Sequence, residues 1–199
     1  MKKLLIILGI CFSACGTTKN IHESDPISET LGIMNNKTVS DDKNYNEVEQ
    51  AFFNADFEIP KQTIQALDFT LFLSEGGIAT LSDFRGKVLI IIFWASHCQY
   101  CREELSLSEV LYHQFKNKEL EILAINNGED GNVVRRFINE NNYTFPVLLD
   151  SDGSVSVGYG IRGIPTIFVL DREGKIIAVH TGRILANQNV LTALNTLFH

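Results

Sequence analysis

From about residue 64 onward, hydrophobic positions follow two alternating patterns. A continuous apolar run, which is typical of a strand buried on both faces, occupies residues 88–94, and further strands are expected at 120–125 and 166–170. Apolar residues at spacings of three and four, which are typical of amphipathic helices, occur within 101–115, 133–138 and 190–198. This alternation predicts an α/β fold in which helices cover a central sheet.

A hairpin is expected at each end of this pattern. Residues 66–73 are rich in β-forming side chains, and Gly76-Gly77 marks a turn before a partner strand at 78–81. Near the C-terminus, the turn Asp171–Gly174 joins two further strands, which must run antiparallel. We therefore predict a three-layer α/β/α sandwich with a mixed central sheet and an added N-terminal β-hairpin.

The first residues have the pattern of an export signal. Residues 1–14 (MKKLLIILGICFSA) contain two lysines, a short apolar stretch and then small residues, as in a secretory signal peptide. The apolar stretch is shorter than the roughly 20 residues needed to cross a bilayer. Residues 12–16 (FSACG) resemble a bacterial lipobox, although Phe12 departs from the commoner leucine. Cys15 would then carry lipid; the alternative is an ordinary signal peptide with an incidental cysteine.

The remaining N-terminal part is polar. Residues 15–60 are expected to form a tether with one possible short helix around Glu47 to Phe53, and residues 61–199 to form the folded domain. With the lipobox, this predicts a protein anchored by lipid to a membrane of the bacterial cell envelope and facing the periplasm. Disulfides form and persist outside the cytoplasm.

Charge and cysteine content narrow the function classes. The chain of 199 residues has 17 Lys and Arg against 24 Asp and Glu, a net charge of −7, and no basic run. It therefore lacks the electrostatic footprint of a nucleic-acid-binding protein. Four cysteines are too few for a disulfide scaffold at this length, so their positions matter more than their number.

Two of the cysteines form the pattern Cys98-Gln99-Tyr100-Cys101 directly after the predicted strand 88–94. Cysteines three apart in the first turn of a helix can reach disulfide geometry without backbone movement. The helix N-terminus stabilises a thiolate through its unpaired N–H groups. Cys98 is the outer residue and is expected to attack, whereas Cys101 would resolve the mixed disulfide.

Other interpretations of this pair are weaker. A purely structural disulfide would close so small a loop that it restricts the unfolded chain little. A zinc site would need a second ligand pair, and the chain contains no other CxxC or HxxxH pattern. The scattered His97, His113 and His180 are read as surface or packing residues. We expect no metal and no cofactor besides the redox-active disulfide.

A second signal is Gly163-Ile164-Pro165-Thr166, just before the predicted strand 166–170. Proline at a strand entrance cannot donate to the sheet and suits a cis peptide bond. If this loop lies beside Cys98, the backbone of Ile164 could pair with an extended client segment. A simple turn proline is the alternative.

Together these stretches resemble a known family. Residues 68–104 and 159–176 contain LSDFRGKV, FWA, CxxC and GIPT in that order, and are similar to TlpA/ResA-type thioredoxin-like proteins with a redoxin (AhpC/TSA-like) domain. Those proteins are membrane-tethered, extracytoplasmic thiol–disulfide oxidoreductases. The resemblance, which covers roughly residues 64–198, implies a thioredoxin fold with Cys98 as nucleophile, Cys101 as resolving thiol and Pro165 as the cis-proline facing them.

The chain departs from the family pattern at several positions. His97 stands where tryptophan is common, Tyr100 where proline is common, and Ile92 where thioredoxin has a buried aspartate. Some relatives carry a glutamate three residues after the second cysteine, and Glu104 matches that place. We hypothesise that Glu104 takes the proton from Cys101. The alternative is a solvated helix glutamate, because three consecutive charged residues cannot all be buried.

The residues beside the cysteines set the direction of the reaction. Trp94, His97, Ile164 and Pro165 are expected to border the client. A protonated His97 would stabilise the thiolate and make the disulfide more oxidising, whereas a neutral, outward His97 would not. The sequence leaves both states open, and with them the redox direction.

The leading hypothesis is a lipid-anchored reductant or exchanger of disulfides in client proteins, recharged by a membrane electron donor. Apocytochrome c is one client class implied by the resemblance, which would give a role in cytochrome c maturation. An oxidase or isomerase is the first alternative. A peroxidase lacks the required Pro-x-x-x-Thr-x-x-Cys pattern, and a non-catalytic peptide-binding lipoprotein would not need the intact CxxC.

Overall fold

The computed structural model describes residues 46–198. The predicted signal peptide, Cys15 and the first part of the predicted tether lie outside the described residues. Within residues 46–198, no helix combines the length and apolarity needed to cross a membrane.

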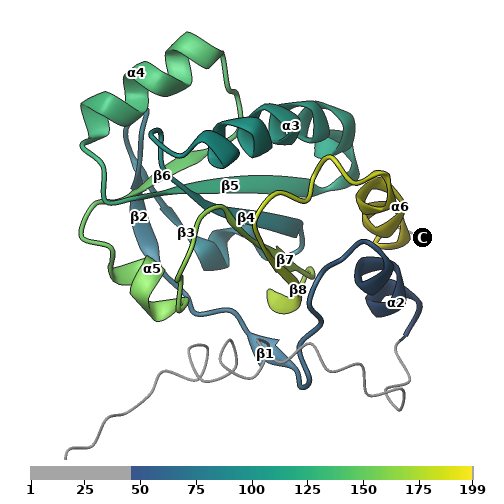
Figure 1. Ribbon diagram of the computed structural model, residues 1–199. Coiled ribbons are helices and arrows are strands. Elements are labelled where there is room, and N and C mark those ends of the chain that lie inside the picture. Colours follow the sequence, from purple (N-terminus) through teal and green to yellow (C-terminus); the bar gives the residue numbers. More distant parts are fainter. Residues whose placement is uncertain (1–45, 199) are drawn as a thin grey trace, which may run out of the picture.

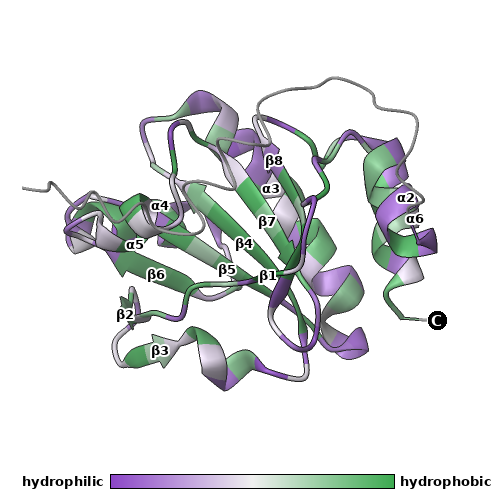
Figure 2. Cartoon of the chain, turned by 90° about the horizontal axis from the view of Figure 1, so that it is seen from below, coloured by the Kyte–Doolittle hydropathy of each residue, from purple (hydrophilic) through white to green (hydrophobic). Residues whose placement is uncertain are grey.

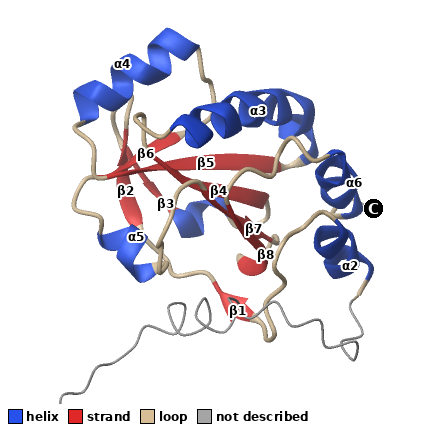
Figure 3. Ribbon diagram, in the orientation of Figure 1, coloured by secondary structure: helices blue, strands red, loops and turns tan. Residues whose placement is uncertain are grey.

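The domain is built on one sheet of eight strands with helices on both faces (Figures 1 and 3). The strands are β1 (Ile64–Gln65), β2 (Thr70–Leu73), β3 (Ile78–Thr80), β4 (Val88–Trp94), β5 (Leu120–Asn127), β6 (Val147–Asp150), β7 (Thr166–Leu170) and β8 (Lys175–Thr181). The helices are α2 (Glu47–Asn54), α3 (Gln99–Phe115), α4 (Gly131–Asn141), α5 (Ser154–Gly158) and α6 (Gln188–Thr196), with 3-10 turns at Leu81–Phe84 and Lys116–Lys118.

The strand order is β1-β8-β7-β4-β5-β6-β2-β3. Strand β5 runs parallel to both β4 and β6, and the other neighbours are antiparallel. The predicted mixed sheet is therefore confirmed, as is the added hairpin, in which β2 pairs with β3 at one edge.

Strand β4 lies at the centre of the sheet and separates two hydrophobic cores. All seven of its residues are buried, as the continuous apolar run predicts. Because side chains alternate along a strand, every second residue from Val88 to Trp94 faces the core under α2, α3, α4 and α6. The residues between them face a second core formed with α5, β1 and the start of β2. Figure 2 shows the central strands as hydrophobic along most of their length.

The segment before β1 belongs to the folded domain. Helix α2 is capped by Asn46 and packs beside α6 (Figure 1), and Phe52 is completely buried in the core under these helices. Glu58 then pairs with Val179 of β8. The possible short helix is confirmed, but the predicted tether boundary at residue 60 is wrong. The few apolar residues of segment 46–60 show no sustained period in the sequence. Their contribution to the core becomes visible only through the packing of α2 against α6, more than 100 residues further along the chain.

We predict that Phe52→Ala lowers the free energy of unfolding by about 3–5 kcal/mol, because it leaves a cavity in the core. The matched control is Phe53→Ala at the neighbouring, 40% exposed position, where a smaller loss is expected. Urea unfolding of both variants measures this difference. Small, equal losses would mean that α2 does not contribute to the core.

Candidate active site

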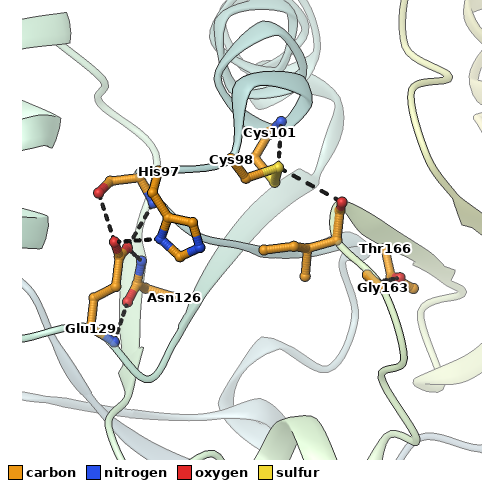
Figure 4. Close-up of a disulfide and its surroundings, with 9 residues drawn as sticks. His97, Cys98, Cys101, Asn126, Glu129, Gly163 and Thr166 are labelled. Carbon is orange, nitrogen blue, oxygen red and sulfur yellow. Dashed lines mark hydrogen bonds and ion pairs between the residues drawn. A yellow bond between two sulfur atoms is a disulfide. The ribbon is translucent and has the colours of Figure 1, made fainter.

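Three loops meet at one edge of the sheet because of the register of β4. Its last residues, Phe93 and Trp94, lie opposite Thr166 at the start of antiparallel β7 and Asn126 near the end of parallel β5. The chain leaving β4, the turn after β5 and the loop entering β7 are therefore neighbours. Figure 4 shows this meeting point.

The two cysteines lie at the start of α3 and form a disulfide, with their Cα atoms 5.2 Å apart. Cys101 is completely buried, whereas Cys98 is only partly buried, as expected for the outer residue. The backbone N–H of Cys101 points at Cys98 Sγ over 3.1 Å. A donor at this position favours negative charge on that sulfur when the disulfide is opened.

The loop before β7 lies beside the outer sulfur. The Ile164–Pro165 peptide bond is cis, and the carbonyl oxygen of Ile164 lies 3.7 Å from Cys98 Sγ. Thr166 Oγ1 donates to the carbonyl of Gly163 over 2.7 Å and so closes the loop on itself. Both expectations for this motif, the cis bond and the position beside Cys98, are confirmed.

Glu104 lies on the buried face of α3, one turn beyond Cys101. Its side chain is fully buried, and its carboxylate accepts hydrogen bonds from the backbone N–H groups of Ile184 and Leu185. Burial raises the pKa of Glu104, and these two N–H groups offset only part of that effect. The solvated alternative for this residue is therefore wrong.

Next to Glu104 on α3, Glu103 is partly exposed. Its carboxylate pairs with Arg183, whose guanidinium also lies 5.0 Å from the centre of the Tyr100 ring. Glu103, Glu104 and Arg183 line a hollow of about 320 Å³. This hollow brings solvent close to the otherwise buried carboxylate.

Of the residues expected to border a client, Trp94 does not reach the surface. Its side chain is completely buried, packs with the ring centre 5.3 Å from that of Phe137, and has no hydrogen-bond partner for its indole N–H. Trp94 lies on the core face of β4 and is part of the hydrophobic core beneath the helices. His97, in contrast, has a 75% exposed side chain.

Sequence reasoning missed a polar cluster beside His97. The Glu129 carboxylate accepts hydrogen bonds from Ser96 N (2.7 Å), Ser96 Oγ (2.7 Å), Asn126 Nδ2 (2.6 Å) and His97 Nδ1 (3.2 Å). Burial alone would raise the pKa of Glu129, but the hydrogen bonds outweigh it and lower the pKa. The only signal in the sequence was an Asn-Gly pair next to a glutamate after a buried strand.

The described residues contain no cluster of three or more His, Cys, Asp or Glu side chains arranged to hold a metal ion. The chemistry available to the arrangement described above is thiol–disulfide exchange. The arrangement combines a partly exposed outer sulfur that faces a backbone N–H, a buried second sulfur, and the carboxylates of Glu104 and Glu129, whose pKa values are shifted in opposite directions.

A pH-dependent stability follows from the buried carboxylate. Because the pKa of Glu104 is raised on folding, the folded state retains its proton where the unfolded chain has lost it. The contribution of Glu104 to the free energy of unfolding is thus largest in acid. It declines as pH rises from the ordinary glutamate pKa of the unfolded chain through the raised pKa of the folded state. We predict that the stability of Glu104→Gln rises relative to the native protein between about pH 4 and 8.

Urea unfolding of the oxidised proteins across this range measures the effect. Glu103→Gln is the control, because that carboxylate is partly exposed and its loss should produce no comparable trend. Parallel stability curves for the native protein and Glu104→Gln would contradict the prediction.

Known proteins are similar to this chain in sequence and in fold. The model of the AhpC/TSA family matches residues 63–179. Thiol-disulfide oxidoreductase ResA of Halalkalibacterium halodurans is 35% identical over 130 residues, which cover 65% of this chain and 74% of ResA. A Chlorobium tepidum structure assigned as thiol:disulfide interchange protein DsbE is 28% identical with a TM-score of 0.65, covering 70% of this chain and 99% of its own. StoA from Bacillus subtilis is 28% identical with a TM-score of 0.55, covering 64% and 97%.

These similarities agree with the geometry of the site. The family model spans more than half of the chain, and the structural neighbours share the thioredoxin-like fold that the motifs predicted. The chain belongs to the AhpC/TSA family and is a thioredoxin-like thiol–disulfide oxidoreductase.

Proposed function

We propose that this oxidoreductase is a lipid-anchored reductant of disulfides in client proteins outside the cytoplasm, with apocytochrome c as one client class. The observation that carries the proposal is the Cys98–Cys101 disulfide at the start of α3, facing the cis Ile164–Pro165 loop. The disulfide of such a pair accepts two electrons, and its dithiol form donates two electrons to the disulfide of another protein.

Cys98 is the nucleophile in this proposal. Its partial exposure and the N–H of Cys101 aimed at its sulfur support attack by the Cys98 thiolate on a client disulfide. Cys101 then attacks Cys98 and releases the client. Glu104, buried one turn further along α3, takes the proton that Cys101 must lose, because a carboxylate with a raised pKa is suited to accept it.

Client binding is assigned to the surface around the outer sulfur. The carbonyl of Ile164 lies beside Cys98 Sγ, where an extended client segment can pair with the backbone at Ile164 and Pro165. His97 borders the same surface with its exposed imidazole. Trp94 has no direct part in this surface because it is buried.

The cellular setting of the proposal rests on the N-terminal sequence. Lysines, a short apolar stretch and the sequence FSACG support export, cleavage before Cys15 and acylation of its thiol. Lipid would hold the domain at a membrane of the cell envelope. A membrane electron donor would return the disulfide to the dithiol after each turnover.

An oxidase or isomerase is the second candidate. The exposed imidazole of His97 directly precedes Cys98, and a positive charge there would stabilise the thiolate relative to the disulfide. A positive charge on His97 that the adjoining Glu129 carboxylate did not offset would make the disulfide a stronger oxidant.

The division of labour between the cysteines is tested by trapping. We predict that reduced Cys101→Ser, mixed with an oxidised Cys-x-x-Cys-His peptide, accumulates a mixed disulfide through Cys98, because no thiol remains to resolve it. Reduced Cys98→Ser is the matched control and should trap at least tenfold less. Its remaining thiol, Cys101, is buried and therefore attacks slowly, even with a general base to remove its proton. Non-reducing gels and mass spectrometry measure the adducts. Trapping by Cys98→Ser instead would contradict the assignment of the nucleophile.

A further inference from the structure

A carboxylate on the outer side of the site holds an imidazole next to the nucleophile. Glu129 follows β5 in the turn before α4, and its side chain is only 15% exposed. Three of its four hydrogen bonds come from Ser96 and Asn126, which fix the carboxylate to the ends of β4 and β5. The fourth comes from His97 Nδ1.

This contact fixes how the ring can be used. Because an ionised carboxylate can only accept a hydrogen bond, Nδ1 of His97 carries the hydrogen and donates a hydrogen bond to Glu129 Oε1 over 3.2 Å. Nε2 is then the ring nitrogen left for a client. Figure 4 shows the ring between Glu129 and the end of the site that holds Cys98.

Two titratable groups adjoin the His97 ring. Glu129 adjoins it from the turn after β5, and Cys98 from the start of α3. Asp130 turns away and accepts from Asn132 N over 2.9 Å at the start of α4. The loop before β7 brings Ile164 and Pro165, which do not titrate. The hydrogen bonds lower the pKa of Glu129, which keeps a negative charge beside the ring at neutral pH.

We propose that His97 is the acid that protonates the leaving sulfur of the client disulfide, and that Glu129 is the residue that positions it. The proposal rests on the proposed function and adds a proton donor for its first half. The two carboxylates then act in different halves of the reaction. Glu129 positions His97 while the client disulfide is opened, and Glu104 accepts the proton of Cys101 when the mixed disulfide is resolved.

Two electrons pass from the Cys98–Cys101 dithiol to the client disulfide in two successive exchanges. The Cys98 thiolate bonds to one client sulfur, the client S–S bond breaks, and its electron pair leaves on the second client sulfur. That sulfur takes a proton from Nε2 of the His97 imidazolium, the form in which both ring nitrogens carry a proton. Cys101 then gives its proton to Glu104, bonds to Cys98 and displaces the first client sulfur, which takes a proton from water. The client disulfide has gained two electrons and two protons, and the Cys98–Cys101 dithiol has been oxidised. His97 then recovers a proton from solvent, and Glu104 releases to solvent the proton that it took from Cys101.

A second histidine pair in the chain provides a matched control. His113 Nε2 lies 2.8 Å from Glu109 Oε1 on a later turn of α3. Glu109 also accepts from the backbone N–H and hydroxyl of Thr144, as Glu129 does from Ser96. Both clusters combine a glutamate, a histidine and a residue that donates its backbone N–H and hydroxyl, although Asn126 has no counterpart in the Glu109 cluster. The His97 cluster adjoins a cysteine of the disulfide.

The test compares two small disulfides that differ in their leaving group. Oxidised glutathione releases an alkyl thiolate that needs a proton, whereas 5,5′-dithiobis(2-nitrobenzoate) releases a stable aryl thiolate that does not. We predict that His97→Ala slows the reaction of the reduced protein with oxidised glutathione by about tenfold or more, in the range of general acid catalysis, and changes the aryl disulfide rate far less. Glu129→Gln should shift the same ratio in the same direction by a smaller factor. Stopped-flow kinetics measures both rates.

The ratio of the two rates separates this role from a structural one. A displaced Cys98 or an altered thiolate would slow both reactions alike, so equal losses would overturn the proposal. Unchanged rates in His97→Ala would overturn it as well, and so would an equal shift in His113→Ala and Glu109→Gln. If the native protein reacts with neither disulfide, the proposed function itself fails.

Discussion

The site depends on the hydrogen-bonded position of β4 between β5 and β7. Because β5 runs parallel to β4 and β7 antiparallel, two strands end and one begins at the same edge of the sheet. That arrangement brings together the start of α3, the turn containing Glu129 and the Ile164–Pro165 loop. The hydrophobic cores on both faces of β4 stabilise it, so the geometry of the site is maintained by apolar packing far from any reacting atom.

On this frame, burial sorts the reactive groups by depth. Cys98 is partly exposed at the start of α3, whereas Cys101 and Glu104 on the same helix are both buried. The two carboxylates of the site have pKa values shifted in opposite directions, because Glu104 is desolvated with few donors and Glu129 receives several. Such divergence allows an inner proton acceptor and an outer charged group to operate at the same pH.

The sequence predicted what depends on local pattern. The apolar run 88–94 gave a fully buried strand, and the CxxC spacing with the GIPT loop gave the disulfide and the cis peptide bond. Residue types and chain order are sufficient for these features. They also place the chain in its family without any knowledge of distances.

The remaining features depend on contacts between distant segments. Glu103 and Glu104 are adjacent and chemically alike, and only the N–H groups of Ile184 and Leu185 show which one is buried. Helix α2 is stabilised through Phe52 by α6, at the other end of the chain. Glu129 is 32 residues from His97, so no local motif connects the two.

Every step proposed for this protein requires Cys98 and Cys101 to form a dithiol–disulfide couple that reduces clients. The most direct test is the equilibrium reduction potential of this pair, on protein lacking residues 1–15, against glutathione and dithiothreitol buffers. For a reductant we expect a single two-electron transition at about −250 mV or lower, near the thioredoxin end of the scale. A value of about −120 to −180 mV would contradict a reductant, and failure of the two cysteines to form a disulfide would contradict the enzymatic account itself.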